Sequence, residues 1–597
     1  MPGSRVAGSW TAQIAWAHDC EVMLARGLAG TRSWWACIWR TTQRKNTDGS
    51  IVRYVQLAHN RRIDGVTQAE VLVNLGREDR LDREGLRRLV ASINRYLGEP
   101  DGTDVGGGAD VRVVVGDALT VAGSRPMGAA WLLDGLWSQL GVASALGKVL
   151  GQRRFTTDVE RVLFALVANR AIDPVSKLAA AEWASNDVTI TGLDAMDEDQ
   201  AYRDMDLLID ADTDAEVQEA VFFAVADLLN LEVDLLFFDT TSTYFETEDV
   251  DEFRRYGKSK DSRPDLPQIV IGLAVTREGV PVRCWCWPGN TNDNSILPEV
   301  KDGLRGWRLG RVVTVVDRGF SSNANLDYLR RAGGHWIAGE KMRDGSPDAH
   351  QVLSRQGRYQ SVRDNLRVKE VRLDGDESGK RWIICHNPFE AERDLAKRTA
   401  ALARVNEELE RIATARTRDR TKRRSDDAHV KAECALRDHP TLGRWVRQLK
   451  SGRLRIDTAK VRAEERLDGK YLLSTSDPDL SAEDVALGYK NLLEAERGFR
   501  DMKSTLDLRP VYHRIESRIR AHVLLCWLAL LLIRVAERRT GLTWRRIAIE
   551  MGRLHTVTLT GTAGTVTQTT PLTEIQQGIV DACGVAAPPR VTHLHHT

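Results

Sequence analysis

The stretch Leu235-Leu-Phe-Phe-Asp-Thr-Thr-Ser242 decides the fold, because an apolar run long enough for a buried strand stops at a carboxylate. The pattern recurs in Arg311-Val-Val-Thr-Val-Val-Asp-Arg-Gly-Phe320. Two further strands are expected between these stretches, at Gln268–Thr276 and Pro281–Trp287, and helices at Ser295–Leu304 and Asn323–Ala332. Strands in this order, with helices after the third and fourth, predict an α/β core.

The remainder of the chain divides by pattern into regions on either side of this core. The predicted regions are an N-terminal extension (1–39), a mixed strand and helix region (40–125), a helical region (126–230), the first part of the core (231–339), an insertion (340–480), the second part of the core (481–545) and a C-terminal tail (546–597). Region 40–125 has strand patterns from Ile51 and Ala69 and a helical pattern over Arg83–Leu97. The insertion combines strands with a long charged helix.

Composition excludes several classes of protein. Of 597 residues, 42% are hydrophobic and 28% charged, which is typical of a globular chain and excludes global disorder. The eight cysteines form no C-x-x-C pair, so a structural zinc site is not expected. The longest apolar run, Val523–Val535, is broken by Arg534 and is shorter than the ~20 residues that span a bilayer. The N-terminal residues 1–36 show no signal-peptide pattern. We therefore expect a cytoplasmic protein with no membrane partner.

Three carboxylates stand out from the surface acids. Asp239 and Asp317 each end an apolar strand, and the carboxyl edge of an α/β sheet is where such folds hold ligands. For either residue alone, a role in a turn or as a helix cap is the alternative. Because the same pattern of an apolar strand followed by Asp occurs twice, a functional site is favoured. The third is Glu496, within Tyr489–Lys503, which we predict to be one helix.

On that predicted helix, an acid shares a face with a phenol and two cations. The face comprises Tyr489, Leu492, Glu496, Arg500 and Lys503, spaced 3, 4, 4 and 3 residues apart. A simple intrahelical ion pair is the alternative, but it explains no such spacing. Three carboxylates from two strands and a helix can hold two Mg²⁺ or Mn²⁺ ions about 3.5–4 Å apart. The site is therefore expected to carry out phosphodiester chemistry.

These residues resemble the DDE transposases of bacterial insertion sequences, specifically the insertion-sequence-four superfamily with its Tyr-Arg-Glu-Lys signature. In that signature, Y-x2-R-x3-E-x6-K, Tyr489, Glu496 and Lys503 are in register, whereas Leu492 replaces the arginine and Arg500 is its expected substitute. Other similar segments are Phe238-Asp-Thr-Thr-Ser, Ser259-Lys-Asp-Ser-Arg-Pro-Asp, Gly289-Asn-Thr-Asn-Asp and Asp317-Arg-Gly-Phe.

The resemblance implies an RNase H-like catalytic core interrupted by an insertion domain. It implies that Asp239, Asp317 and Glu496 are catalytic and bind two Mg²⁺ or Mn²⁺ ions, and that Tyr489, Arg500 and Lys503 bind DNA. In related enzymes excision passes through a DNA hairpin with a base stacked on an insertion-domain aromatic. Trp336 and Trp382 are candidates here, although core packing is the favoured role for each.

The implied activity is metal-dependent cleavage at the ends of an insertion sequence, followed by 3′-hydroxyl strand transfer into target DNA. Its partners would be the terminal inverted repeats, the target duplex and a second copy of the chain in a synaptic complex, near the bacterial nucleoid. Residues 50–120 are expected to bind the element ends. Two alternatives stay open: a catalytically inactive DNA-binding regulator, and an RNase H-like nuclease without strand transfer.

The net charge of +1 conceals two opposed regions. Asp194–Asp234 contains fourteen acids and one base, a net of −13. Arg500–Arg546 contains eleven bases and four acids, a net of +7, and follows the proposed catalytic Glu. The regional charges therefore permit a nucleic-acid partner that the whole-chain value seemed to exclude.

Overall fold

The computed structural model describes residues 37–45, 51–63, 66–77, 119–150, 158–212, 215–231, 233–307, 309, 311–343, 345–373, 379–422, 427–562 and 564–596. The chain divides into two compact units, Met1–Val114 and Val115–Thr597. Each unit is described by itself.

The first unit contains a three-stranded antiparallel sheet in the order β1-β2-β3. The strands are β1 (Cys37–Lys45), β2 (Ile51–Ile63) and β3 (Val66–Arg77). The strands expected from Ile51 and from Ala69 are thus confirmed. The N-terminal extension up to residue 36 and the helix expected over Arg83–Leu97 lie outside the described residues.

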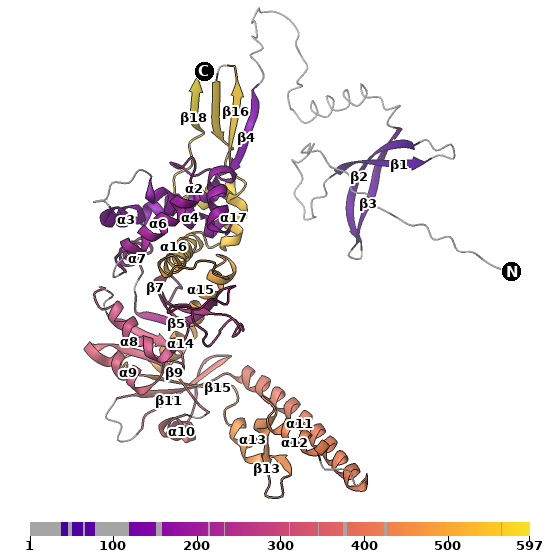
Figure 1. The fold of residues 1–597 in the computed structure, drawn as a ribbon, viewed down its shortest axis with the longest axis vertical. Coiled ribbons are helices and arrows are strands. Elements are labelled where there is room, and N and C mark those ends of the chain that lie inside the picture. The colour runs from indigo at the N-terminus through magenta and orange to yellow at the C-terminus, as the bar shows by residue number, and fades with distance from the viewer. Residues whose placement is uncertain are drawn as a thin grey trace, which may run out of the picture. The chain divides into compact units, whose positions relative to one another are not determined.

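The second unit is built on a nine-stranded mixed sheet in the order β10-β11-β12-β15-β9-β8-β5-β6-β7 (Figure 1). Its core strands are β5 (Leu235–Tyr244), β6 (Gln268–Thr276), β7 (Pro281–Pro288), β8 (Val313–Val316) and β9 (His335–Glu340). The first three are antiparallel neighbours, and β8 and β9 run parallel to β5. This arrangement is that of an RNase H-like fold, so the expected fold class is confirmed.

Helices cover both faces of the core sheet. On one face, α8 (Asp293–Gly303) and α9 (Asn323–Arg330) pack on an apolar cluster that includes Phe238 and Val316. On the other face, Phe237 and Val315 belong to the main core, with residues of helices α14 (Ala482–Lys490), α15 (Leu493–Ser504) and α16 (Glu516–Thr540). The alternation of side chains along each strand thus supplies both apolar surfaces of a three-layer architecture.

The insertion continues the core sheet. Strand β15 (Lys470–Thr475) pairs antiparallel with β9, and β12 (Arg381–His386), β11 (Leu366–Val371) and β10 (Gln360–Arg363) follow outward. The helix α10 (Pro347–Ser354) follows β9 in sequence. Between β12 and β15 lies a smaller module, whose elements are α11 (Pro388–Lys422), α12 (Asp427–Arg437), β13 (Val446–Gln448), β14 (Leu454–Ile456) and α13 (Thr458–Glu465).

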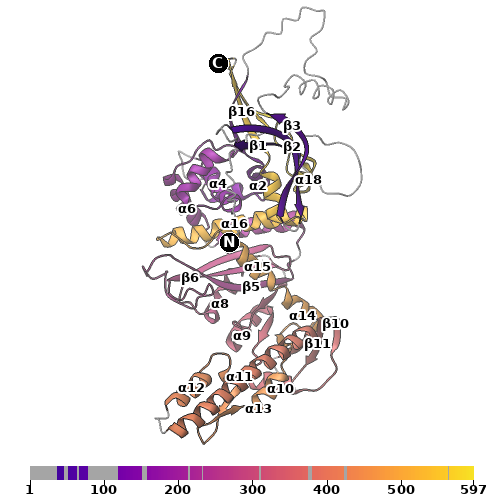
Figure 2. The ribbon, with the colours of Figure 1, turned by 90° about the vertical axis from the view of Figure 1, so that its right-hand side faces the viewer.

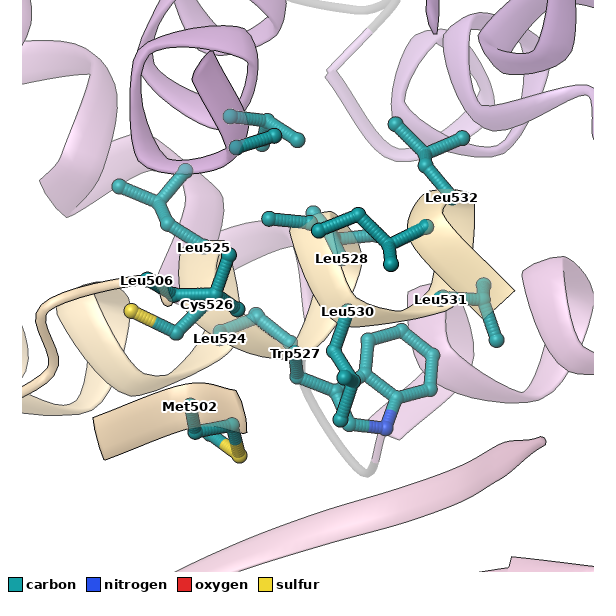
Figure 3. Packing of buried hydrophobic residues seen from close by; sticks show 14 of the residues in the cluster. Met502, Leu506, Leu524, Leu525, Cys526, Trp527, Leu528, Leu530, Leu531 and Leu532 are labelled. Atoms are coloured by element: carbon teal, nitrogen blue, oxygen red, sulfur yellow. The ribbon is translucent and has the colours of Figure 1, made fainter. Parts of the chain in front are cut away.

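Helix α16 (Glu516–Thr540) lies between the helical region and the sheet (Figure 2). The helical region comprises α2 (Gly128–Gln139), α3 (Val142–Leu150), α4 (Val159–Ile172), α5 (Lys177–Glu182), a π-helical turn (Trp183–Asp187), α6 (Glu198–Ala211) and α7 (Glu216–Leu229). Leu524–Leu532 are buried around the whole circumference of α16 (Figure 3), as expected for a helix that is apolar on every side. Although α16 is long and apolar enough to cross a membrane, 94% of its apolar window is buried inside the protein.

The C-terminal residues are not a simple tail. Residues 546–597, predicted as one, contribute to α17 (Trp544–Met551) and form β16 (His555–Gly561), β17 (Gly564–Thr569), α18 (Glu574–Ala582) and β18 (Val591–His596). The strands pair antiparallel with each other and with β4 (Thr120–Pro126) in the order β18-β17-β16-β4. The end of the chain is therefore joined to the start of the helical region.

An ion pair connects α16 to α15 (Leu493–Ser504). Arg534, 4% exposed, binds Asp501 of α15 at 2.5 Å and Glu537 of its own helix at 2.6 Å. We expect Arg534→Ala to lower the free energy of unfolding by about 3 kcal/mol, because Asp501 and Glu537 lose their buried partner and are left with Arg497, which is 45% exposed. Urea unfolding measures this. Exposed Arg538 on the same helix is the control, and an equal loss for Arg538→Ala would contradict the prediction.

Candidate active site

Asp239 and Asp317 follow corresponding positions on two adjacent parallel strands. The last residue pair in the β5–β8 register is Phe238 with Val316, so the two aspartates come next on each strand. They share the side-chain direction of Phe237 and Val315, which belong to the α16 face. One detail of the prediction is wrong: Asp239 does not end its strand, because β5 continues to Tyr244 through its pairing with β6.

Helix α15 places Glu496 above the same face of the sheet. Its buried side is Ala495, Gly498, Phe499 and Met502, and Glu496 is exposed at its first turn. A Cβ at Gly498 would lie 2.8 Å from Leu273 Cδ2, so glycine lets the helix approach the strand paired with Asp239. The charges of Asp317 and Glu496 both act on Asp239, so the three predicted carboxylates lie in one region of this face.

The single helix predicted for Tyr489–Lys503 is two helices. Helix α14 (Ala482–Lys490) carries Tyr489, and α15 begins at Leu493. The turn between them places Leu492 in the core, where it is 7% exposed, so this departure from the family signature contributes packing. The break gives Tyr489 a direction independent of the Glu496 face.

Tyr489 reaches Asp317 across this break. Its hydroxyl donates a hydrogen bond of 2.7 Å to Asp317 Oδ1, and its ring stacks on Tyr471. A Cβ at Gly339 would lie 2.3 Å from the Tyr489 hydroxyl oxygen, so only glycine on β9 leaves room for it. Burial, reinforced by the Asp317 charge, raises the pKa of Tyr489 and keeps it a hydrogen-bond donor. Tyr489 thus positions Asp317.

Lys260 and Asp293 both contact Thr240, the residue after Asp239, and neither was predicted as a site residue. Lys260 Nζ donates to the carbonyl oxygen and the hydroxyl of Thr240 at 2.7 and 2.6 Å. Asp293 accepts a 2.7 Å hydrogen bond from the Thr240 hydroxyl and lies 3.7 Å from Lys260. Both residues fall in segments that resemble the family, which was the available signal.

Lys503, predicted to bind DNA, is held inside the protein. Its Nζ lies 2.7 Å from Asp261 Oδ1 and 2.6 Å from Thr241 Oγ1, and its side chain is 10% exposed. Arg509 binds the same Asp261 oxygen. Burial lowers the pKa of Lys503, and the Asp261 carboxylate opposes this shift. Lys503 therefore connects α15 to the loop after β5.

The other residues considered from the sequence have contrasting environments. Arg500 is exposed on α15, and its side chain has no ion pair with any other residue that the structure describes. Trp336 and Trp382, the candidates for base stacking, are 2% and 1% exposed. Both are core residues, which is the role favoured for them from the sequence. Arg500 is thus the most accessible of the three predicted DNA contacts.

The electrostatics and the donor atoms suit a divalent cation. Burial, opposed by the charge of Lys260 and reinforced by the charges of Asp317 and Glu496, raises the pKa of Asp239 to about 6. Mutual repulsion of this kind is relieved by a cation, and carboxylate oxygens are preferred ligands of Mg²⁺ and Mn²⁺. Among the described residues, however, no three acidic, His or Cys side chains converge closely enough to coordinate one ion as they stand. The residue types fit the metal, and binding it would require side-chain adjustment.

Comparison with known families decides what kind of protein carries this site. A family model described as a transposase DDE domain matches residues 234–532, half of the chain. The chain belongs to the DDE transposases. A second model, described as the N-terminal domain of the IS1634 family of transposases, matches residues 39–104. The predicted relationship to an insertion-sequence transposase is confirmed.

Several chains of solved structures are also similar to this transposase. Among them is a cryo-EM structure of the piggyBac transposase synaptic complex with hairpin DNA, with 10% sequence identity and a TM-score of 0.32. The similarity covers 71% of this chain and 78% of that chain. A comparison with curated proteins gave no match.

The Tyr489 hydrogen bond predicts a defect in metal binding. Tyr489→Phe should lower the affinity for Mn²⁺ by about 10–100-fold, because partners that orient metal ligands typically contribute this much. Isothermal titration with Mn²⁺ measures the effect. Tyr512→Phe removes a hydroxyl from a side chain that is 73% exposed and should change nothing. Equal affinities for the Tyr489 variant and the unmodified protein would refute the positioning role.

Lys503 and Arg500 should respond differently to substitution. Lys503→Met should lower the free energy of unfolding by about 3 kcal/mol, because Asp261 keeps only Arg509. Arg500→Gln should leave stability within about 0.5 kcal/mol. It should instead reduce the slope of log binding constant against log salt for duplex DNA by about one. Urea unfolding measures the stability of both variants, and fluorescence anisotropy measures their binding to duplex DNA. An Arg500 variant that is destabilised but keeps the slope unchanged would contradict these assignments.

Proposed function

We propose that this transposase cleaves DNA at the ends of an insertion sequence and joins the liberated 3′-hydroxyls to target DNA. The observation that carries the proposal is the placement of Asp239 of β5 beside Asp317, the residue that follows β8, beneath the Glu496 helix and within a matched DDE domain. Carboxylates from two strands and a helix are the ligand set that two-metal phosphodiester chemistry requires.

Asp239, Asp317 and Glu496 would hold two Mg²⁺ or Mn²⁺ ions. When bound, the ions would supply activation of water or a 3′-hydroxyl and stabilisation of the leaving 3′-oxygen. Tyr489 fixes the orientation of Asp317 through its hydrogen bond. Lys260 balances the negative charge near Asp239, and Thr240 links it to Asp293. Arg500 contacts the phosphate backbone from the exposed side of α15, and Lys503 is proposed as a second contact that leaves Asp261 when DNA binds.

The proposed division of labour follows the regions of the chain. Residues 40–125 bind the terminal inverted repeats, 231–339 and 481–545 carry out the chemistry, and 340–480 form the insertion domain. We further propose that two copies assemble with both ends in a synaptic complex near the nucleoid in the cytoplasm, and that excision passes through a hairpin. The burial of Trp336 and Trp382 means that another residue would stack on a flipped base in that step.

Substitution of each carboxylate tests the chemistry. Asp239→Asn, Asp317→Asn and Glu496→Gln should each abolish Mg²⁺-dependent nicking of a duplex that carries the element end, because each removes a metal ligand. Binding to the same duplex should persist. Glu494→Gln, on the same helix but beside Gly279, is the matched control and should cleave normally. Full nicking by the Glu496 variant would defeat the assignment.

The products of the same assay separate the candidate functions. Covalent joining of the 3′ ends to a target plasmid is expected for the proposed transposition reaction. Nicking without joined products would indicate a nuclease without strand transfer. DNA binding without any metal-dependent nicking would indicate a catalytically inactive regulator. Hairpin ends on a denaturing gel would support the proposed intermediate.

A further inference from the structure

A β-hairpin in the insertion carries a concentrated positive charge that the site described above does not use. Residues 443–462 contain seven bases and one acid, a net of +6, whereas the whole chain has a net charge of +1. The one acid, Asp457, caps α13 by accepting hydrogen bonds from the backbone of Ala459 and Lys460. Among the described residues, it forms no ion pair with a base of the hairpin.

The hairpin has two different faces. Val446, Leu454 and Ile456 pack in a cluster with Val405 and Ile412 of α11, which fixes the hairpin to the insertion module (Figure 1). On the outer face, Arg447 lies directly opposite Arg455 in the strand register, and both are exposed. Lys450 and Arg453 extend this exposed basic surface at the loop. The alternation of side chains along the strands thus separates an apolar underside from a basic outer face.

The four cations of the outer face have no acidic partner among the residues that the structure describes. None of Arg447, Lys450, Arg453 and Arg455 forms an ion pair with another residue in the described part of the chain. Like charges placed directly opposite each other on paired strands are destabilising. The loop is nevertheless well defined: Leu449 N donates to Arg453 O at 2.8 Å, and Gly452 N donates to Leu449 O at 2.8 Å. The hydrogen-bonded hairpin therefore presents to its surroundings cations that repel one another.

We propose that this hairpin is a second DNA-binding surface, which contacts the phosphate backbone of duplex DNA outside the catalytic site. Double-stranded DNA carries one negative charge per about 1.7 Å of its axis, and relieves the Arg447–Arg455 repulsion by placing phosphates against both side chains. Contacts of this kind are independent of sequence. The choice of DNA as ligand rests on the proposed function; the surface itself rests on the geometry of the hairpin.

The test is the salt dependence of duplex binding by the full chain. Arg447→Gln/Arg455→Gln should reduce the slope of log binding constant against log salt by about two units on a duplex of unrelated sequence. Arg447→Lys/Arg455→Lys keeps both charges and should keep the slope. The matched control is Arg393→Gln/Arg411→Gln, which removes two exposed arginines of α11 that already pair with Glu390 and Glu408. Its slope should stay unchanged.

Each outcome is decisive. An unchanged slope for the Arg447/Arg455 glutamine variant, with unaltered circular dichroism and melting temperature, would overturn the proposal. Equal losses in the variant and the control would also overturn it, because they would indicate only a net-charge effect. A slope reduction seen with single-stranded RNA but not with duplex DNA, or with an acidic polypeptide alone, would assign the surface to another partner and reject the proposal.

The same proteins separate this proposal from the proposed function. The Arg447/Arg455 glutamine variant should still nick pre-bound end DNA at saturating protein, since its active-site residues are intact. One outcome is that the unmodified protein shows no metal-dependent nicking while the hairpin variant shows the reduced slope of log binding constant against log salt. In that case the hairpin proposal stands and the proposed function fails. Normal nicking with an unchanged slope would support the proposed function and overturn the hairpin proposal.

Discussion

The architecture depends on the burial of α16. Leu, Ile, Val, Trp and Ala side chains surround this helix, and they contact the helical region on one side and the α15 face of the sheet on the other. Each fully buried aliphatic side chain contributes roughly 1.5–3 kcal/mol, so a helix with this many is the main source of cohesion between two layers. Because α15 packs on α16 and is joined to it through Arg534, the position of Glu496 follows from this burial.

The polar interactions near the site connect elements that the burial of α16 has already brought together. Tyr489 holds Asp317, Lys260 counteracts the charge near Asp239, and Asp261 holds Lys503. These contacts join elements that are far apart in the sequence: α14 to the residue after β8, and α15 to the loop between β5 and β6. Burial in a medium of low dielectric strengthens each of them and makes the loss of one partner costly. The side chains around the carboxylates are therefore held mainly by hydrogen bonds and charge compensation on an apolar scaffold.

The sequence was sufficient to predict those parts of the site that have a local signal. Apolar runs that reach Asp239 and Asp317 predicted adjacent strands, and the family signature identified α15. Three features had no such signal. Leu492 continues the helical spacing, so the break after Lys490 could not be seen; Asp261 lies 242 residues from Lys503; and the continuation of β5 beyond Asp239 depends on its pairing with β6. The C-terminal strands did have a local signal. The threonines of His555–Thr569 alternate with other residues, which is the period-two pattern of a strand, but this segment was predicted to be a tail.

The pairing of β15 with β9 limits how the insertion can change during evolution. An insertion attached through a flexible linker can be exchanged between relatives as a cassette. Here a cut at the ends of the insertion would remove the hydrogen-bonded neighbour of β9 and leave an open sheet edge, which is prone to pair with other chains. A viable recombinant would have to inherit β15 together with β9 from one parent. Lineages are therefore expected to vary this region by lengthening the segment between β12 and β15, where α11 and the basic hairpin lie, while keeping the shared ladder.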